Sequence, residues 1–292
     1  MKKAFLLSLV ALFFLATFSS CFKQADDIYN PKCKIMNVWY DEMTGTAEEI
    51  YTYENKELSK LTYSEDGLYL LITHNKNGTI SKITAYEANG VATGESVTMT
   101  YDKTLIATMS YIDDGTVYQK NEFTHVDKKI SSIKVYLDNS ISKSKLSKSR
   151  LYRRCFGDPD QFGKLFDIIG AKGLDLDLEY LLTYTGDNLT KIQYEEDYYD
   201  IHIAMTQTME YDNMINPYFG FNFYFENFLG YTKNNPTKVT STTVYTGGYE
   251  ATESSVLICT YQFNKYDFPT SITLEDENGH IDNIYFLEYD KK

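Results

Sequence analysis

Alternation of apolar and polar side chains is the most regular feature of the chain between about residues 35 and 290. Four short stretches show it clearly, with apolar side chains at every second position: 68–72, 97–101, 174–178 and 201–205. A period of two places successive side chains on opposite faces of an extended strand. Each stretch therefore predicts a half-buried β-strand.

A short phrase recurs along the chain: an apolar residue, two polar or small residues, and a second apolar residue. The copies are Leu58–Leu61, Ile80–Ile83, Ile106–Met109, Ile130–Ile133 and Leu189–Ile192, with proline first in Pro236–Val239 and Pro269–Ile272. The first four copies begin 22, 26 and 24 residues apart, which is room for two strands and two short turns. We predict that each copy opens the second strand of a hairpin, where a proline removes no central ladder bond.

Turn signals separate the predicted strands at short intervals. Asn-Gly or Asp-Gly pairs occur at 66–67, 77–78, 89–90, 114–115 and 278–279, and such pairs favour tight antiparallel hairpins. Counting strands between turns gives roughly 15–17. The sequence therefore predicts an all-β chain: an antiparallel up-and-down meander that forms a large curved sheet or barrel-like structure.

Two longer gaps interrupt the repeated phrase and predict insertions near 140–172 and 212–233. The first contains the basic run Ser142–Arg154, for which we expect a solvated loop; contact with lipid phosphates or a polyanionic glycan is the alternative. Asp158 and Pro159 then form an N-cap and a first helical position. Apolar residues up to Gly170 follow, so one short helix is predicted over 159–169, within a single domain over 34–292.

The N-terminus has the composition of an export signal. Two lysines precede an apolar run from Ala4 to Phe18, and two serines and Cys21 follow. About 15 apolar residues are too few for a membrane-spanning helix, which needs ~20, so we expect a signal peptide over 1–20. Its end resembles the lipobox of bacterial lipoproteins, which implies lipidation of Cys21 and a lipidated tether over 21–33.

Charge and the residues after Cys21 restrict the location and the partners. The segment Phe22–Asp27 resembles the acidic export tags of surface lipoproteins, which implies a lipid-anchored outer-membrane protein on the cell surface, with the periplasmic face as the alternative. The net charge is −13, and loss of Lys2 and Lys3 with the signal makes the mature chain more acidic. Nucleic acid is therefore excluded as a partner, and the N-terminal acyl chains must supply the membrane attachment.

Aromatic and cysteine content add two expectations. The chain has 27 Tyr and 17 Phe but one Trp, which favours β-structure over a carbohydrate-binding aromatic platform. If Cys21 is lipidated, three cysteines remain, so at most one intramolecular disulfide can form. We expect Cys259 to be a buried thiol, because it shares a strand face with Leu257 and Tyr261. An oxidising compartment allows a disulfide between Cys33 and Cys155, but the sequence does not indicate one.

Residues 217–231 form the most aromatic segment of the chain. Phenylalanines at a period of two would lie on one face of a strand, although part of the set also fits helical spacing. One interpretation is a wall inside a barrel-like sheet that binds an apolar ligand. The other is an insertion that fills the core of a curved sheet. The candidate ligand-binding residues are Phe219, Phe221, Phe223, Phe225 and Phe228.

Candidates for catalysis or metal binding are weak. The densest acidic cluster contains Glu195, Glu196, Asp197, Asp200 and His202, but it lacks the spacing of known calcium loops and fits a solvated hairpin tip. No nucleophile elbow, P-loop or dinucleotide fingerprint occurs in the sequence. We expect no catalytic residues, no metal site and no cofactor. A hydrolase with paired carboxylates is the least favoured alternative, since the fold sets their separation.

The export signal, the Tyr-rich hairpins and the proline copies Asn234–Val239 and Asp267–Ile272 together resemble a known family. It is a Bacteroidetes lipoprotein family of unknown function described as having a porin-like fold, and the similarity spans most of residues 35–292. The phrase also resembles, more loosely, the YD repeats of large bacterial surface proteins. The family's motifs are structural, so the resemblance implies a fold and an anchor but no functional residues.

A porin-like fold does not imply a pore in this sequence. The predicted strands carry polar residues opposite their apolar face, as at Ser81, Thr98, Thr100 and Glu275, and such residues are costly on a lipid-facing barrel wall. We expect a curved sheet that is apolar inside and surrounded by water. The expected function is a non-catalytic binding module for an apolar or glycan ligand. The alternative is a structural or interaction subunit that meets a protein partner in an outer-membrane complex.

Overall fold

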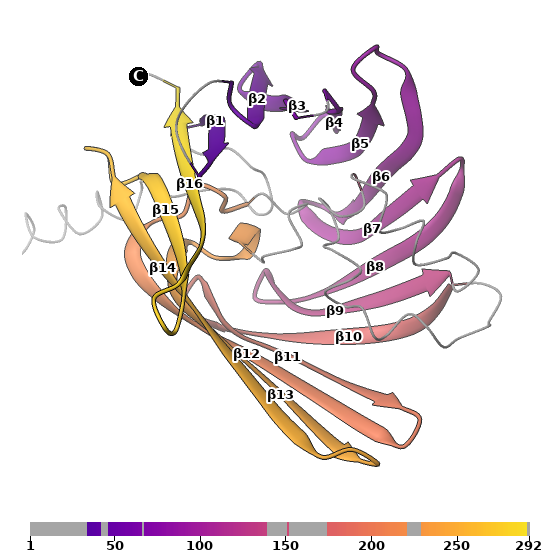
Figure 1. Ribbon diagram of the computed structural model, residues 1–292. Helices are drawn as coiled ribbons and strands as arrows, with labels where there is room; N and C mark the ends of the chain where they lie inside the picture. The colour runs from indigo at the N-terminus through magenta and orange to yellow at the C-terminus, as the bar shows by residue number, and fades with distance from the viewer. Residues whose placement is uncertain are drawn as a thin grey trace, which may run out of the picture.

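The computed structural model describes residues 34–41, 46–65, 67–138, 151, 174–220 and 229–290. Within them, sixteen β-strands form one antiparallel sheet, and each strand pairs with its neighbours in sequence (Figure 1). The sheet closes into a barrel because β1 pairs with β16 as well as with β2. The predicted all-β meander is confirmed.

The strand bounds follow the predicted hairpin order. They are β1 Ile35–Tyr40, β2 Glu49–Glu54, β3 Glu57–Tyr63, β4 Tyr69–His74, β5 Ile80–Tyr86, β6 Ala92–Asp102, β7 Leu105–Asp113, β8 Thr116–Val126, β9 Lys129–Asp138, β10 Leu174–Thr185, β11 Asn188–Tyr198, β12 Ile201–Ile215, β13 Asn234–Gly247, β14 Ala251–Phe263, β15 Pro269–Asp276 and β16 Ile281–Tyr289. A short 3-10 helix, η2, spans Leu229–Tyr231. The helix predicted over 159–169 and the N-terminal signal and tether lie outside the described residues.

The repeated phrase opens the odd-numbered strands from β3 to β15, and in each of them its second residue is the extra residue of a β-bulge. In β3, for example, Leu58 pairs with Tyr53 while Lys60 pairs with Thr52, so Ser59 has no partner residue in β2. The corresponding residues of the other six strands are Ser81, Ala107, Ser131, Thr190, Thr237 and Thr270.

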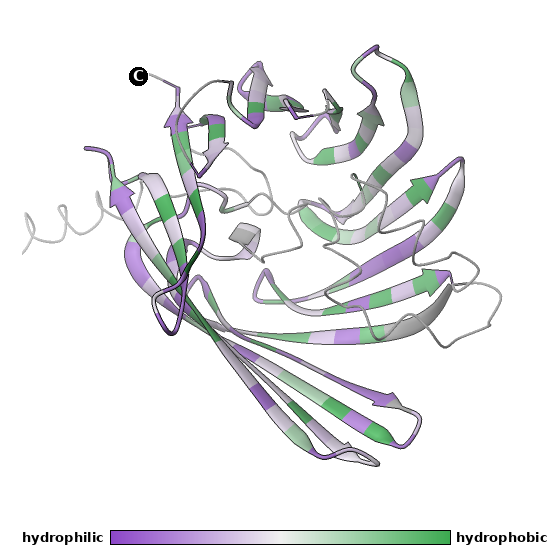
Figure 2. Cartoon of the chain, in the orientation of Figure 1, coloured by the Kyte–Doolittle hydropathy of each residue, from purple (hydrophilic) through white to green (hydrophobic). Residues whose placement is uncertain are grey.

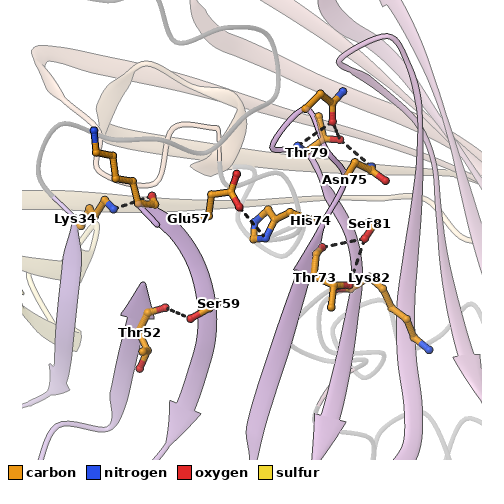
Figure 3. Close-up of polar contacts among 12 residues, drawn as sticks. Lys34, Thr52, Glu57, Ser59, Thr73, His74, Asn75, Thr79, Ser81 and Lys82 are labelled. Atoms are coloured by element: carbon orange, nitrogen blue, oxygen red, sulfur yellow. Dashed lines mark hydrogen bonds and ion pairs between the residues drawn. The ribbon is translucent and has the colours of Figure 1, made fainter. Parts of the chain in front are cut away.

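The bulges explain the spacing of the phrase. Residues three apart in a regular strand point to opposite faces, and one extra residue brings them to the same face. Ile106 and Met109 are accordingly both 0% exposed. In five strands the bulged hydroxyl donates to the carbonyl across from it, as Ser81 Oγ does to Thr73 O at 3.1 Å (Figure 3). The other four such donors are Ser59, Ser131, Thr190 and Thr270.

All seven bulges lie at one end of the barrel, because the odd-numbered strands begin there. We call this the bulge end. The first and last described residues also meet there, where Lys34 N donates to Asp290 Oδ1 at 2.9 Å. Several turns at this end use left-handed backbone, for example Asp127 and Lys128 with φ of 50° and 66°, which suits the tight hairpin turns that match strand twist.

Strands β11 to β14 extend beyond the ring as a four-stranded projection (Figure 1). Its segments are Tyr194–Tyr198, Ile201–Gln207, Ser241–Gly247 and Ala251–Val256, which pair in that order. We call this the arm. No residue whose burial is described in these four segments is buried, and among them Tyr194, at the base of the arm, packs against the hydrophobic core.

Candidate functional site

The inner wall of the barrel is the first candidate site. Buried side chains lie on one face of the sheet, and only the inner face of a closed sheet brings side chains from all strands together. They form one hydrophobic cluster that includes Leu61, Leu70, Ile83, Val97, Met109, Tyr111, Ile133, Leu182 and Ile192. Most of the wall is therefore apolar, as predicted from the alternation.

Several polar groups on the inner wall are paired with one another, although Asn121 Nδ2 has no hydrogen-bond partner among the described residues. The Glu49 carboxylate, 3% exposed, accepts hydrogen bonds from Tyr40 Oη at 2.6 Å and from Tyr51 Oη at 2.7 Å. Gln119 Nε2 donates to Asn121 Oδ1 at 2.9 Å. Such pairing offsets the cost of removing these groups from water.

The outer face of the sheet has the opposite character. Its residues alternate with the buried ones along strands such as β4 and β7, and Figure 2 shows hydrophobic and hydrophilic residues alternating along the strands. Threonine pairs cross neighbouring strands, as Thr100 and Thr108 do with 2.7 Å between their hydroxyl oxygens. Other outward side chains include Lys82, Thr84, Thr98, Ser110, Lys120, Glu122, Lys134 and Glu179. The wall is apolar inside and mostly polar outside.

The ends of the Phe-rich insertion are held together at the bulge end. Asn216 N donates to Lys233 O at 3.0 Å, and Gly220 N donates to Gly230 O at 2.8 Å. Asn216 is 3% exposed, and its Nδ2 donates to Thr232 O at 2.8 Å. We call residues 216–220 and 229–235 the neck. The chain thus enters and leaves the insertion through one hydrogen-bonded pair of segments.

Asparagines attach the neck to the barrel wall. Asn188 Oδ1 accepts from Asn234 N at 3.0 Å and from Thr232 Oγ1 at 3.2 Å. Asp212 accepts from Asn235, with Nδ2 3.1 Å from Oδ2. Amide and carboxylate side chains here satisfy main-chain groups that strand pairing leaves open, because the register of β12 and β13 shifts beyond Glu210.

An ion cluster joins the neck to two hairpin turns. Asp187 lies 3.3 Å from Lys129 Nζ and 3.3 Å from Lys233 Nζ. Partial burial of Asp187 acts to raise its pKa, but the hydrogen bonds and charges of the two lysines outweigh burial, so the pKa is lowered. Because Asp187 is 53% exposed, water weakens these pairs. The cluster positions the neck more than it stabilises the fold.

One of the five predicted ligand-binding residues lies in the described part of the chain. Phe219 is half-buried in the neck, where its N–H donates to Asn216 O at 3.3 Å. Phe221, Phe223, Phe225 and Phe228 lie outside the described residues.

Sequence reasoning did not single out Tyr231, at the other end of the insertion. It is 5% exposed and belongs to the hydrophobic cluster, and Figure 1 shows its turn within the ring of strands. The described ends of the Phe-rich segment therefore contact the barrel interior.

The connection between β9 and β10 also reaches the core. Leu151 is the one residue between these strands that the structure describes, and it is 0% exposed within the hydrophobic cluster. The solvated loop predicted for Ser142–Arg154 is wrong at this position. The prediction rested on the basic residues of this segment, and a leucine among them gave no sign of a buried position.

Two solved structures are similar to this chain in fold. A porin-like protein from Bacteroides vulgatus ATCC 8482 is 11% identical, and the match covers 80% of this chain and 97% of that chain with a TM-score of 0.44. For a porin-like protein from Bacteroides uniformis ATCC 8492 the identity is 10%, the coverage 90% and 100%, and the TM-score 0.39. No protein-family model and no curated protein sequence matches the chain.

The acidic cluster predicted at residues 195–202 lies at the tip of the arm. His202 Nδ1 and Asp197 Oδ1 are 2.7 Å apart, and Asp200 O accepts from Gly248 N at 2.9 Å. In the described part of the chain, no three His, Cys, Asp or Glu residues are grouped for metal binding. The same residues include no helix long and apolar enough to cross a membrane.

Cys259 is the buried thiol that the sequence predicted. It is 7% exposed on β14. Burial raises the pKa of its thiol to about 11, with an opposing effect from Tyr261. A thiol that stays protonated is a poor nucleophile, so Cys259 packs as a small apolar side chain.

Proposed function

We propose that the protein is a non-catalytic binding module of the cell envelope that holds an apolar ligand against the inner wall of its barrel. The binding region would be bounded by the neck, with Phe219 on one side and Tyr231 on the other, and by core residues of the adjoining strands. The other four phenylalanines of the insertion complete the proposed set of ligand contacts.

The apolar inner wall is the observation that carries this proposal. Core side chains come from strands on every side of the barrel, so a ligand inside would exchange water for apolar contact over most of its surface. Several described polar inner groups pair with one another, as Glu49 does with Tyr51 and Gln119 with Asn121, and Asn121 Nδ2 is a buried donor without a hydrogen-bond partner in the described part of the chain. An apolar molecule therefore suits this wall better than a glycan, which needs many hydrogen-bond partners.

Fluorescent fatty-acid binding tests the proposal. Purified mature protein is titrated with cis-parinaric acid, and lipid extracted from the untreated protein is analysed by mass spectrometry. Phe219→Ala should weaken probe binding about tenfold. Tyr199→Ala is the matched control, because Tyr199 lies in the β11–β12 turn at the tip of the arm with 81% exposure, and it should leave binding unchanged. Absence of both probe binding and extractable lipid would contradict the proposal.

We also propose that Cys21 carries the lipid that attaches the protein to the outer membrane, facing the cell surface, as a member of the Bacteroidetes lipoprotein family. Palmitate labelling of wild type and Cys21→Ala checks the anchor, since the variant should lose both the label and membrane association. Protease added to intact cells then distinguishes the cell surface from the periplasmic face: a surface protein is digested, whereas a periplasmic one is protected.

A second candidate function is an interaction subunit of an envelope complex. The arm favours it, because its described residues include no buried side chain and it extends the surface away from the ring. This role does not exclude a ligand in the barrel, since the arm and the neck involve different parts of the strands.

A further inference from the structure

The arm has a free edge on each side among the described strands. β11 separates from β10 beyond the pair Gln193–Leu181, so residues 194–198 pair with β12 alone. β14 meets β15 only from Leu257 onward, so residues 251–256 pair with β13 alone. Figure 1 shows these hairpins running out from the ring. Each edge presents main-chain N–H and C=O groups on its open side.

The two edges differ in the features that prevent pairing with another strand. The β11 edge carries three consecutive carboxylates, Glu195 to Asp197, and charged side chains protect an edge strand. The β14 edge carries one charge, Glu253, in the sequence Ala-Thr-Glu-Ser-Ser-Val. It contains no proline or lysine, and its register with β13 is regular from Ala251 to Ile258. The β14 edge is therefore the one open to pairing.

The β14 edge is exposed and bounded at both ends. Residues 252–255 are all exposed, and six residues of strand span roughly 20 Å. The β15–β16 turn adjoins one end, because Asp276 pairs with Leu257. The tip of the arm adjoins the other end and is tightly packed, since a Cβ on Gly247 would clash with Asp200 O. The edge has the length of one short added strand.

Charge indicates which kind of strand would pair there. The four segments of the arm and their two connecting turns contain no Lys or Arg, and their carboxylates are Glu195, Glu196, Asp197, Asp200, Glu250 and Glu253. A second copy of this chain, with a net charge of −13, would be repelled. A basic segment would be attracted and oriented by the same field.

We propose that residues Ala251–Val256 bind an extended basic segment of a partner protein, which adds to the arm as a fifth strand beside β14. The proposal rests on the second candidate function, the interaction subunit, and specifies its site and the chemistry of its partner. Main-chain hydrogen bonds supply the affinity in this binding mode, and side chains supply the specificity. Lysine or arginine side chains of the partner segment would lie near Glu253 and Glu250.

A synthetic peptide tests the site directly. The probe is an end-blocked eight-residue peptide of alternating threonine and lysine, and the control peptide has glutamate in place of lysine. Hydrogen exchange of the full mature chain is followed with each peptide. The basic peptide should slow exchange of main-chain amides within residues 251–256, and the acidic peptide should not. Protection at residues 194–198 instead, or binding of neither peptide at millimolar concentration, would overturn the proposal.

A charge reversal separates edge binding from general attraction. Glu253→Lys should weaken binding of the basic peptide at least tenfold. Glu87→Lys makes the same change on the exposed β5–β6 turn and should leave binding within twofold of wild type. Equal weakening by both variants would mean non-specific attraction. A concentration-dependent dimer that protects residues 251–256 without peptide would show a second copy at the edge. Either result contradicts the proposal.

Photo-crosslinking in intact cells distinguishes failure of the site from failure of the interaction role. A crosslinking amino acid replaces Ser254 on the edge or Thr100 on the outer face of β6. A partner captured at Ser254 whose crosslinking the basic peptide blocks supports the edge site. A partner captured at Thr100 alone overturns the edge site and leaves the interaction role standing. No partner at either position overturns the role itself.

Discussion

The hydroxyl at the second position of the repeated phrase replaces a hydrogen bond that the bulge disrupts. Ser131 Oγ donates to Thr124 O at 3.2 Å, and four other copies make the same bond. Tyrosines act in the same way on the first residue of the phrase: Tyr261 Oη donates to Pro236 O at 2.6 Å and Tyr289 Oη to Pro269 O at 2.7 Å. Some of the tyrosines thus donate hydrogen bonds to main-chain carbonyl groups beside the bulges.

Removing this hydroxyl should lower the free energy of unfolding, and adding it where it is absent should raise that free energy. Ser131→Ala should lower the free energy of unfolding by about 0.5–1 kcal/mol, the usual net value of a partly exposed hydrogen bond. Ala107 occupies the same position in β7 without a hydroxyl, so Ala107→Ser should raise it by up to about 1 kcal/mol. Urea unfolding measures both. If Ala107→Ser destabilises while Ser131→Ala is neutral, the role given to the hydroxyl is wrong.

Two half-buried histidines should make the fold less stable in mild acid. Burial lowers the pKa of His74, against an opposing effect of Glu57, and burial lowers the pKa of His125, against Asp102. Figure 3 shows His74 beside Glu57. Because the unfolded chain then binds more protons than the folded one, the free energy of unfolding falls as pH drops below about 6.5.

Urea unfolding at pH 7 and pH 5 checks this dependence. The double variant His74→Gln, His125→Gln should lose less stability between the two values than wild type. His280→Gln, at an exposed position, should behave like wild type. An unchanged slope in the double variant would show that other groups cause the acid sensitivity.

The buried thiol of Cys259 should react slowly in the native state. With Cys33 and Cys155 replaced by serine in the mature chain lacking Cys21, Ellman's reagent should modify Cys259 at least a hundredfold faster in denaturant than in buffer. Burial and the raised pKa both reduce the amount of accessible thiolate. Rapid modification without denaturant would contradict the placement of Cys259 in the core.

At the scale of elements, the neck is the part of the candidate site with the most specific hydrogen bonding. Asn216 and Asn235 are 3% and 2% exposed; Asn216 donates to Thr232 O, just before β13, and Asn235 donates to the Asp212 carboxylate of β12. Loss of a buried side chain with such partners leaves main-chain and carboxylate groups unpaired. The neck therefore determines where the Phe-rich segment begins and ends.

Asn216→Ala should cost about 1–3 kcal/mol, the cost of leaving buried partners unsatisfied, and should make the chain more sensitive to proteases around residues 216–233. Asn278→Ala, in the exposed β15–β16 turn, is the control and should change neither property by a measurable amount. Thermal unfolding and limited proteolysis give the two readouts. Equal protease resistance in both variants would mean that the neck does not hold the insertion.

The sequence predicted the strands better than it predicted the bulges and the contacts between distant segments. Strict alternation identified strands such as 97–101, and the phrase located the start of every odd-numbered strand from β3 onward. The bulges were not predicted, because apolar residues three apart contradict a period of two unless one residue is extra. The neck was missed for a different reason: Asn188 and Asn234 are 46 residues apart, and no local pattern indicates that they meet.

For the molecule as a whole, the distribution of apolar side chains is the reverse of that in a membrane-spanning barrel. Such a barrel needs an apolar outer band facing lipid and carries polar groups inside. Here the cluster of buried residues lies inside, while Thr100, Lys120 and Glu122 lie on the outer face. We therefore expect the outer face of the described barrel to lie in water, with the proposed lipid on Cys21 supplying membrane attachment.

Labelling of single cysteines tests this arrangement most directly. Met99 and Thr100 are neighbours on β6 with opposite directions: Met99 is 6% exposed, and Thr100 is exposed. Met99→Cys and Thr100→Cys are made in the mature chain lacking its other cysteines and treated with a water-soluble maleimide in detergent-free buffer. The account predicts rapid labelling at position 100 and labelling at least a hundredfold slower at position 99. Equal rates, or a chain that stays in solution only with detergent, would contradict it.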